Sequence, residues 1–260
     1  MIKPFMRGLG AYKHAHHLVW KEGMWKHLII PGLLSMLYFP LVIGGLFGGT
    51  FFGVQELSEL ISEKWLPAEV AEWAAWGLSI IVGLLAIYLA FLLYRSVVMI
   101  IYAPFIGFIS ETAEEKFHGS KGPGFTVGGL VYDIYRGTMV SLMTLAISLF
   151  LTVVCWLLWL LPVAGAAIYF VGMLIIQAYF AGAGFMDPVL ERRRVGIRSS
   201  LAHSYRHKWH AMGNGAGFMI MMLVPIVGWF LAPSYGIIAA AVSGVDTMYD
   251  DELSRKRSRS

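Results

Sequence analysis

Long apolar stretches without charged side chains alternate with short charged segments along this chain. Four stretches lack Asp, Glu, Lys and Arg altogether: 28–55, 73–94, 137–186 and 211–245. A helix needs about 20 apolar residues to cross the roughly 30 Å hydrocarbon core of a bilayer. The first two stretches therefore fit one crossing each, and the third is long enough for two.

The order of residues inside these stretches favours helices over strands. Backbone N–H and C=O groups find no partners in lipid, so a spanning segment is either a helix or part of a closed barrel. Barrel strands alternate apolar and polar residues over about ten positions. Residues 84–93 read Leu-Leu-Ala-Ile-Tyr-Leu-Ala-Phe-Leu-Leu, without alternation. The sequence predicts an all-α integral membrane protein built as a single membrane domain, 1–260.

The first half of the chain is predicted to enter and leave the membrane once. Residues 1–27 read as an amphipathic helix on the membrane surface, and 28–54 and 73–105 as two long transmembrane helices. Between them, segment 55–72 carries one Lys, whereas the N-terminal segment carries five Lys and Arg. Basic segments stay on the cytoplasmic side, so both the N-terminus and the basic tail, 250–260, are predicted to be cytoplasmic.

The second half is predicted to form two helical hairpins. The segment 138–185 has Pro162 near its middle, which indicates a hairpin apex. The segment 211–246 is divided by Pro225 and Pro233 into arms of about 13 residues, shorter than a full crossing. We expect a re-entrant hairpin that penetrates only part of the bilayer, and the alternative is two short crossings.

The overall composition agrees with a membrane protein. Hydrophobic residues make up 58% of the chain and charged residues 14%, whereas a soluble domain carries about a quarter charged residues. The sequence contains no phosphate-binding loop, no Ser–His–Asp arrangement and no paired catalytic carboxylates, and its acidic residues are expected in exposed loops. These features predict a protein that is not an enzyme and needs no cofactor.

Several short motifs occur in a defined order along most of the chain. They are Pro31-Gly32-Leu33-Leu34, Phe39-Pro40-Leu41, Ala103-Pro104-Phe105 followed by 111–117, Phe185-Met186-Asp187-Pro188 with the arginines after it, and Val224-Pro225 with Ala232-Pro233. Together they resemble the CysZ family of bacterial sulfate permeases, within the superfamily of etoposide-induced membrane proteins. The resemblance implies an inner-membrane protein with two long spanning helices, partly penetrating hairpins, oligomeric assembly and passive sulfate uptake for cysteine synthesis.

Two departures from the family pattern leave the substrate open. The family has an Arg directly after its Pro-Gly-Leu motif, in a position tied to sulfate binding, and this chain has Leu34 there. The Asn that usually follows the Pro-Leu motif is also missing, with Gly44 or Gly45 nearby. The function expected is therefore passive transport of sulfate or a related oxyanion. The alternative is a membrane-organising scaffold protein that transports nothing.

The segment after Pro31 is the first candidate anion site, formed by Gly32, Leu33 and Ser35. A helix that begins near Pro31 would expose unpaired N–H groups, and its dipole would favour an anion there. Gly32 would let an oxyanion approach the backbone closely, and Ser35 could add a hydroxyl. The alternative is an ordinary helix start in which Gly32 serves helix packing.

Charged side chains near the apolar stretches are the next candidates. Arg95 is flanked by apolar residues on both sides, so it either faces a polar cavity and contributes to anion binding or reaches lipid phosphates at the cytoplasmic interface. Asp133 and Arg136 are three residues apart on one helical face, and a structural pair between them is expected.

Three histidines share one predicted helix face: His203, His207 and His210, at positions i, i+4 and i+7. Such spacing can supply metal ligands. No carboxylate or Cys lies next to them in the sequence, and Arg206 and Lys208 would oppose a cation. A surface helix without a metal is therefore preferred, and a metal site is the alternative.

The expected partners follow from the basic segments and the glycines. Basic segments beside the membrane indicate contact with anionic lipids and not with nucleic acid. Glycines recur in two groups and support close helix approach, in a homo-oligomer or within the chain. They are Gly44, Gly45, Gly48, Gly49 and Gly53, and then Gly182 and Gly184.

Overall fold

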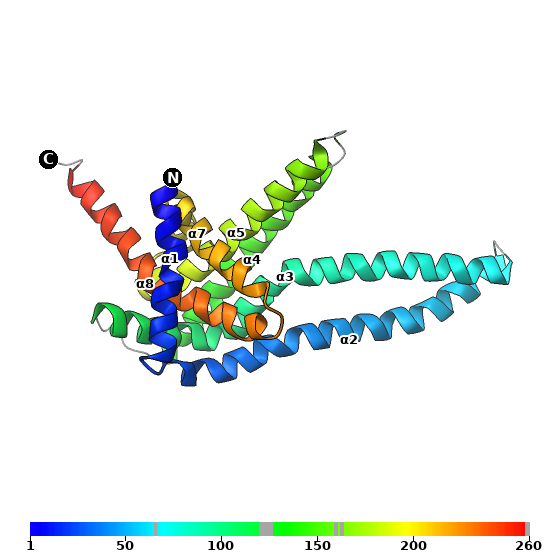
Figure 1. Cartoon of the computed structure of the whole chain (residues 1–260), viewed down its shortest axis with the longest axis horizontal. Helices are drawn as coiled ribbons and strands as arrows, with labels where there is room; N and C mark the ends of the chain where they lie inside the picture. Colours follow the sequence, from blue (N-terminus) through cyan, green and yellow to red (C-terminus); the bar gives the residue numbers. More distant parts are fainter. Residues whose placement is uncertain (65–66, 120–126, 159–160, 162–163, 258–260) are drawn as a thin grey trace. The chain divides into compact units, whose positions relative to one another are not determined.

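The computed structural model describes residues 1–64, 67–119, 127–158, 161 and 164–257. Within this part the chain forms eight α-helices and no strand, which confirms the all-α prediction. The helices are α1 (Ile2–Trp20), α2 (Trp25–Lys64), α3 (Ala68–His118), α4 (Val127–Leu158), α5 (Gly165–Arg192), α6 (Ile197–Arg206), α7 (Lys208–Met222) and α8 (Val227–Arg257) (Figure 1).

Five of these helices are long and apolar enough to cross a membrane. Their apolar windows are Trp25–Val42, Val70–Tyr88, Tyr135–Leu158, Gly165–Arg192 and Val227–Tyr249. Each window has 18 residues or more, near the length that a crossing requires. The chain is thus an integral membrane protein with several membrane-length helices.

The chain divides into two compact units, of which the second is Met36–Val97. This unit is a hairpin of α2 and α3. At one end of the pair, the hydroxyl of Tyr38 donates to the carbonyl of Ala90 at 2.9 Å, and its ring meets Tyr94 edge-on. At the other end, Ala71 and Ala75 are fully buried. Many exposed side chains of α3 are large and apolar, among them Trp73, Ile81 and Leu84.

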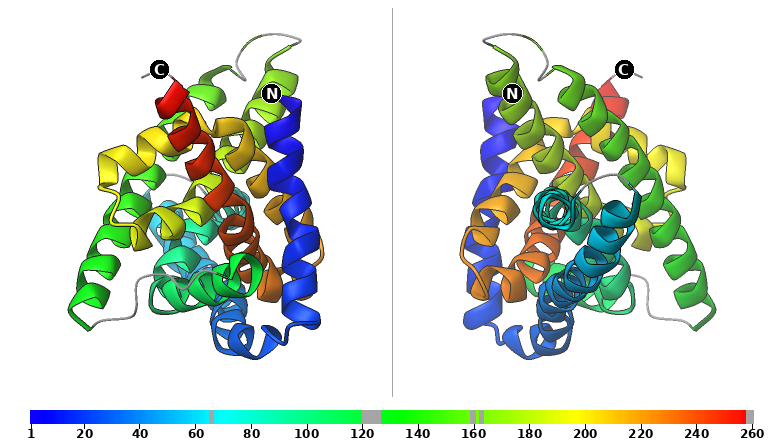
Figure 2. Two further views of the ribbon diagram at one scale, coloured as in Figure 1. Left: turned by 90° about the vertical axis from the view of Figure 1, so that its left-hand side faces the viewer. Right: turned by 90° about the vertical axis from the view of Figure 1, so that its right-hand side faces the viewer.

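The first unit comprises Met1–Ser35 and Val98–Ser260. In its centre, α7 packs against α5 on one side and against α1 on the other (Figure 2). Glycine makes the α5–α7 contact close. A methyl group at Gly182 would lie 1.7 Å from the carbonyl oxygen of Ala211, and one at Gly215 would lie 1.8 Å from that of Ala178. Backbones approach this closely only where no side chain intervenes.

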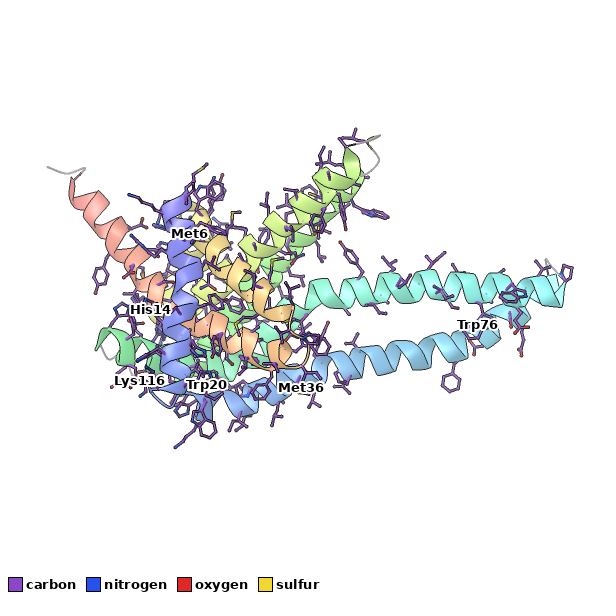
Figure 3. The ribbon with its side chains drawn as sticks, in the orientation of Figure 1. Met6, His14, Trp20, Met36, Trp76 and Lys116 are labelled. Carbon is purple, nitrogen blue, oxygen red and sulfur yellow. The ribbon has the colours of Figure 1, made fainter. Side chains whose placement is uncertain are left out.

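Helix α1 is shorter than the predicted 1–27 helix and packs differently. It ends at Trp20, and Gly23 takes a positive φ of 74° in the turn before α2. Its buried face consists mostly of small residues, Gly8, Ala11, Ala15, Leu18 and Val19. This face lies against α7 and α8. The end of α3 contacts the same region of the chain. The ring of Phe117 meets that of His14 on α1, and Lys116 pairs at 3.6 Å with Glu22 in the turn after α1. His14 and Lys116 are labelled in Figure 3.

Helices α4 and α5 pack side by side as a hairpin (Figure 1). Helix α4 ends at Leu158, and α5 begins at Gly165. The expected apex residue, Pro162, lies outside the described residues. Large apolar side chains, among them Phe150 and Phe170, are exposed along both helices. Such surfaces are stable in lipid and costly in water.

The last hairpin differs from the two equal arms expected. The turn at 223–226 contains Pro225, and α8 then runs through Pro233 without a break. The prediction that Pro233 divides the segment is therefore wrong. A proline removes one helix hydrogen bond, here to the carbonyl of Trp229. The hydroxyl of Ser35 lies 2.8 Å from that carbonyl and 2.9 Å from the carbonyl of Gly32 on its own helix. A side chain from α2 is thus placed to replace the missing backbone donor.

Candidate functional site

The expected anion site after Pro31 lacks the free backbone donors that motivated it. Helix α2 begins at Trp25, so the expectation that it starts near Pro31 is wrong. The unpaired N–H groups of a helix belong to its first four residues, and Gly32 lies beyond them. The space over Gly32 is also filled, because the ring of Phe230 lies 2.8 Å from where a side-chain carbon would be.

The two other residues of that candidate site face different surroundings. Ser35 is fully buried, and its hydroxyl lies within hydrogen-bond distance of the carbonyls of Gly32 and Trp229. The side chain of Leu33 is 52% exposed. Arg95 is on α3 in the second unit, and its side chain lies outside the described residues. The structure therefore does not bring Leu33 and Ser35 together at one polar surface.

A cluster of buried charges lies at one end of the α4–α5 hairpin instead. The guanidinium of Arg136, on α4, forms two parallel hydrogen bonds with the carboxylate of Asp187, on α5, at 3.0 and 3.1 Å. Its Nη1 also reaches Glu191 at 3.3 Å, and its Nε donates to the carbonyl of Val195 at 2.9 Å. Arg136 is 1% exposed. Bidentate geometry and full hydrogen bonding are what a buried ion pair needs to be stable.

A second set of ion pairs continues the cluster toward α3. The carboxylate of Glu114, 3% exposed, accepts from Nη2 of Arg192 and, at 2.5 Å, from Nη2 of Arg193. Among the described residues, the Nε and Nη1 atoms of Arg192 are buried without a hydrogen-bond partner. Buried donors left unpaired carry a desolvation cost of about 1–3 kcal/mol each, more when charged. This edge of Arg192 would be stabilised by an anion that accepts from it.

The cluster lies at the ends of the apolar, membrane-length segments of α4 and α5. The window on α4 begins at Tyr135, next to Arg136, and the window on α5 ends at Arg192. Both boundaries fall at the same end of the hairpin. The cluster therefore lies where the membrane-length segments meet polar surroundings. A charge there avoids the cost of lying at the bilayer centre.

Sequence reasoning missed this cluster. The acidic residues were expected in exposed loops, and this is wrong for Glu114 and Asp187, which are buried. The partners of Arg136 are Asp187 and Glu191, and the side chain of Asp133 lies outside the described residues. The signal available was Asp187 at the end of an apolar stretch, directly before Pro188 and the run of arginines. Its partner, 51 positions earlier, could not be read from helical periodicity.

The three histidines do not stay on one helix face. Helix α6 ends at Arg206, and His207 forms the junction to α7 with a ψ of 29°. The change of direction separates His210, whose Nε2 lies 3.0 Å from the hydroxyl of Ser243 on α8. His203 and His207 remain together, and Asp251 of α8 joins them.

The helices and the buried charge cluster together define an all-α integral membrane protein with several spanning segments. Residues 11–233 match the family described as "Sulfate transporter CysZ/Etoposide-induced protein 2.4", and the chain belongs to this family. The family predicted from the ordered motifs is thus confirmed.

Relatives of known name extend over nearly the whole chain. A sulfate transporter CysZ of Pectobacterium atrosepticum is 25% identical over 234 residues, which cover 87% of this chain and 82% of the relative. One of Pseudomonas aeruginosa is 26% identical over 247 residues, 92% of each chain. These relatives are named as transporters and not as enzymes, which confirms the prediction of a non-enzymatic protein.

Proposed function

We propose that this protein lets sulfate or a related oxyanion pass into the bacterial cytoplasm without an energy source, and so supplies sulfur assimilation. The names of the relatives support the substrate class. The sequence offers no phosphate-binding loop that would couple transport to ATP. The buried carboxylates Glu114 and Asp187 are held in ion pairs with arginines, which suits a fixed binding surface better than a proton relay.

The observation that carries this proposal is the unpaired edge of Arg192. Its Nε and Nη1 are buried donors, while Nη2 is fixed by Glu114. A sulfate oxygen accepts strongly from a guanidinium, and charge-assisted hydrogen bonds are about twice as strong as neutral ones. Arg192 and Arg193 share the carboxylate of Glu114, so Arg192 keeps two donors for an anion. An anion held by these donors alone is bound weakly enough to leave again, as conduction requires.

This site differs from the one that the sequence suggested. The family has an arginine directly after its Pro-Gly-Leu motif. In this chain the residue there is Leu34, which is 37% exposed and has no charge. Arg192 supplies the guanidinium from α5 instead. The oxyanion is therefore expected to bind at the α4–α5 end of the first unit, among donors from side chains and not from a helix start.

We also propose a placement in the membrane. The run of arginines after Asp187 puts this end of the hairpin on the cytoplasmic side by the positive-inside rule, together with both termini. Helix α7, with 15 residues, spans about 22 Å and is too short to cross alone. The turn after it exposes Leu223, Val224 and Ile226. An apolar apex on a short arm fits a hairpin that dips into the bilayer.

The glycines of α2 support a proposal of homo-oligomers. A methyl group at Gly44, Gly45, Gly48, Gly49 or Gly53 would meet no atom of the described residues within 4 Å. Among the described residues this face of α2 is open, and we propose that it packs closely against another molecule in the membrane. A second copy of this chain is the proposed partner, and anionic lipids are expected at the basic termini.

The transport proposal is tested by sulfate uptake into proteoliposomes that contain the purified chain. We expect wild-type protein to admit radiolabelled sulfate down its gradient, without ATP or a proton gradient. Arg192→Gln removes the unpaired donors and should lower uptake at low sulfate about tenfold or more, since a hydrogen bond to a charged group contributes about 1.5–3 kcal/mol.

The matched control is Arg198→Gln, since Arg198 is an exposed arginine on the neighbouring helix α6. It should transport like the wild type. Uptake that is equal in both variants would contradict the role of Arg192. Uptake no greater than that of empty liposomes would contradict transport and favour the scaffold alternative.

A further inference from the structure

A group of three metal-ligating side chains lies outside the charge cluster, where α6 meets the end of α8. It consists of His203, His207 and Asp251, whose ligand atoms all lie within 4.8 Å of one another. Nε2 of His207 is 2.8 Å from Oδ1 of the carboxylate, and Nδ1 of His203 is 3.2 Å from Oδ2. The aspartate comes from a part of the chain 44 residues beyond His207.

The ring of His203 lies between two side chains of α8. Its Nε2 is 2.9 Å from the hydroxyl oxygen of Thr247, and its Nδ1 is 3.2 Å from Oδ2 of Asp251. The hydroxyl of Thr247 also lies 2.6 Å from the carbonyl of Gly244 on its own helix. Thr247 therefore holds the ring with Nδ1 toward the carboxylate.

Histidines that bind a metal through one ring nitrogen usually have an outer partner on the other nitrogen, which orients the ring. Thr247 on Nε2 has that place for His203. Nδ1 is then the nitrogen that faces His207 and Asp251, and ligand atoms of all three residues lie within 4.8 Å of one another.

We infer that His203, His207 and Asp251 form a binding site for a divalent transition metal, best suited to Zn²⁺. Two imidazole nitrogens and a carboxylate oxygen are a donor set that zinc accepts, with a fourth position open to water. One ligand atom from each of the three residues lies within 4.8 Å of the other two. Zinc–ligand bonds of about 2.0–2.2 Å place tetrahedral ligands roughly 3.3 Å apart, so small side-chain rotations would bring the three atoms into that geometry.

The cations nearest to the site do not block it. The side chain of Arg206, 53% exposed, donates to Oδ2 of Asp251 at 2.9 Å. A carboxylate oxygen has two lone pairs, so it can accept from Arg206 and bind a metal at once. The ammonium of Lys208 lies over the ring of Tyr205, 4.9 Å from its centre. Arg206 and Lys208, which the sequence suggested would oppose a bound cation, therefore leave room for one.

A metal at this site would join the end of α8 to α6. The next contact along α6 is Ser200, whose hydroxyl donates to Asp187 in the charge cluster. Metal binding would then hold α6 in place at the edge of that cluster. The site itself is independent of transport, and its test uses binding alone.

The experiment measures metal binding by the purified full-length protein, without an affinity tag, after removal of metals with a chelator. Co²⁺ is added first, because its visible absorption reports imidazole coordination, and Zn²⁺ then displaces it. We expect one Zn²⁺ per chain and a higher melting temperature with Zn²⁺ present. Asp251→Asn and His207→Ala should each weaken binding by more than about 100-fold, and Thr247→Val by about 10–100-fold as an outer partner.

His17→Ala is the control, since His17 is an exposed histidine on α1, and it should bind like the wild type. Circular dichroism checks that the variants keep their helices. His207 and Asp251 have side chains that are 19% and 21% exposed, so these substitutions should be tolerated. The inference is overturned if the wild type binds no Zn²⁺, or if Asp251→Asn and His207→Ala bind it as tightly as the wild type.

Discussion

The hydroxyl of Ser35 lies 2.8 Å from the carbonyl oxygen of Trp229, the carbonyl that Pro233 leaves without a helix donor. This contact joins α2 to α8 in the first unit. It explains why a proline can lie inside a membrane-length helix, since side chains from neighbouring helices can satisfy the freed carbonyl. Ser35 was predicted to contact an anion, and the structure gives it a structural partner instead.

The first prediction follows from this contact. Ser35→Ala leaves the Trp229 carbonyl without this donor and should destabilise the protein by about 1–3 kcal/mol. In a Pro233→Ala background the backbone N–H returns, and the same substitution should cost much less. Denaturant unfolding in detergent of both single variants and the double variant measures the coupling. Additive effects would show that Ser35 does not compensate for Pro233.

The second prediction concerns the Arg136–Asp187 pair. Asp187→Asn removes the bidentate carboxylate from a buried guanidinium and leaves it the longer ion pair with Glu191, which should cost about 3 kcal/mol. Glu22→Gln breaks the exposed pair with Lys116 and should cost no more than about 1 kcal/mol. Thermal unfolding of the two variants compares them directly. Similar losses of stability would mean that the Arg136–Asp187 pair is not buried as described.

The third prediction concerns the glycine contact between α5 and α7. Gly182→Ala forces a methyl group against the Ala211 carbonyl and should strongly destabilise the first unit. Gly184→Ala, two residues along the same helix, meets nothing among the described residues within 4 Å. It should stabilise the helix by about 0.5–1 kcal/mol, because alanine is the better helix former. Melting temperatures that shift in the same direction would contradict the close packing.

The membrane-length helices could be predicted from the sequence because lipid imposes a length and a composition on each of them. The turn at Pro225 was also visible, since a short segment there leaves helical structure. Pro233 gave the same local signal and produced no break. Pro233 is tolerated inside α8 because Ser35 of α2 contacts the carbonyl that the proline leaves without a helix donor. Ser35 is almost 200 positions away in the sequence, so local patterns do not reveal this contact.

In the candidate site, too, the sequence did not reveal contacts between residues that are far apart in the chain. The ordered motifs around Gly32 and Asp187 identified the family, but they did not show which residues pair. Arg136 was expected to pair with Asp133 on its own helix, which the described side chains do not test. The two acids that the structure describes beside it lie on α5. Likewise, the carboxylate beside His203 and His207 comes from α8. Such partners depend on tertiary packing, so they become visible only once the helices are placed.

The central claim is that Arg192 binds an oxyanion with its buried donors. The most direct measurement is a crystal structure with selenate in place of sulfate, in which anomalous scattering locates the anion. We predict selenate within hydrogen-bond distance of Nε and Nη1 of Arg192, and its loss in Arg192→Gln crystals. Selenate bound beside Gly32 with none at Arg192, or unchanged binding in the variant, would contradict the claim.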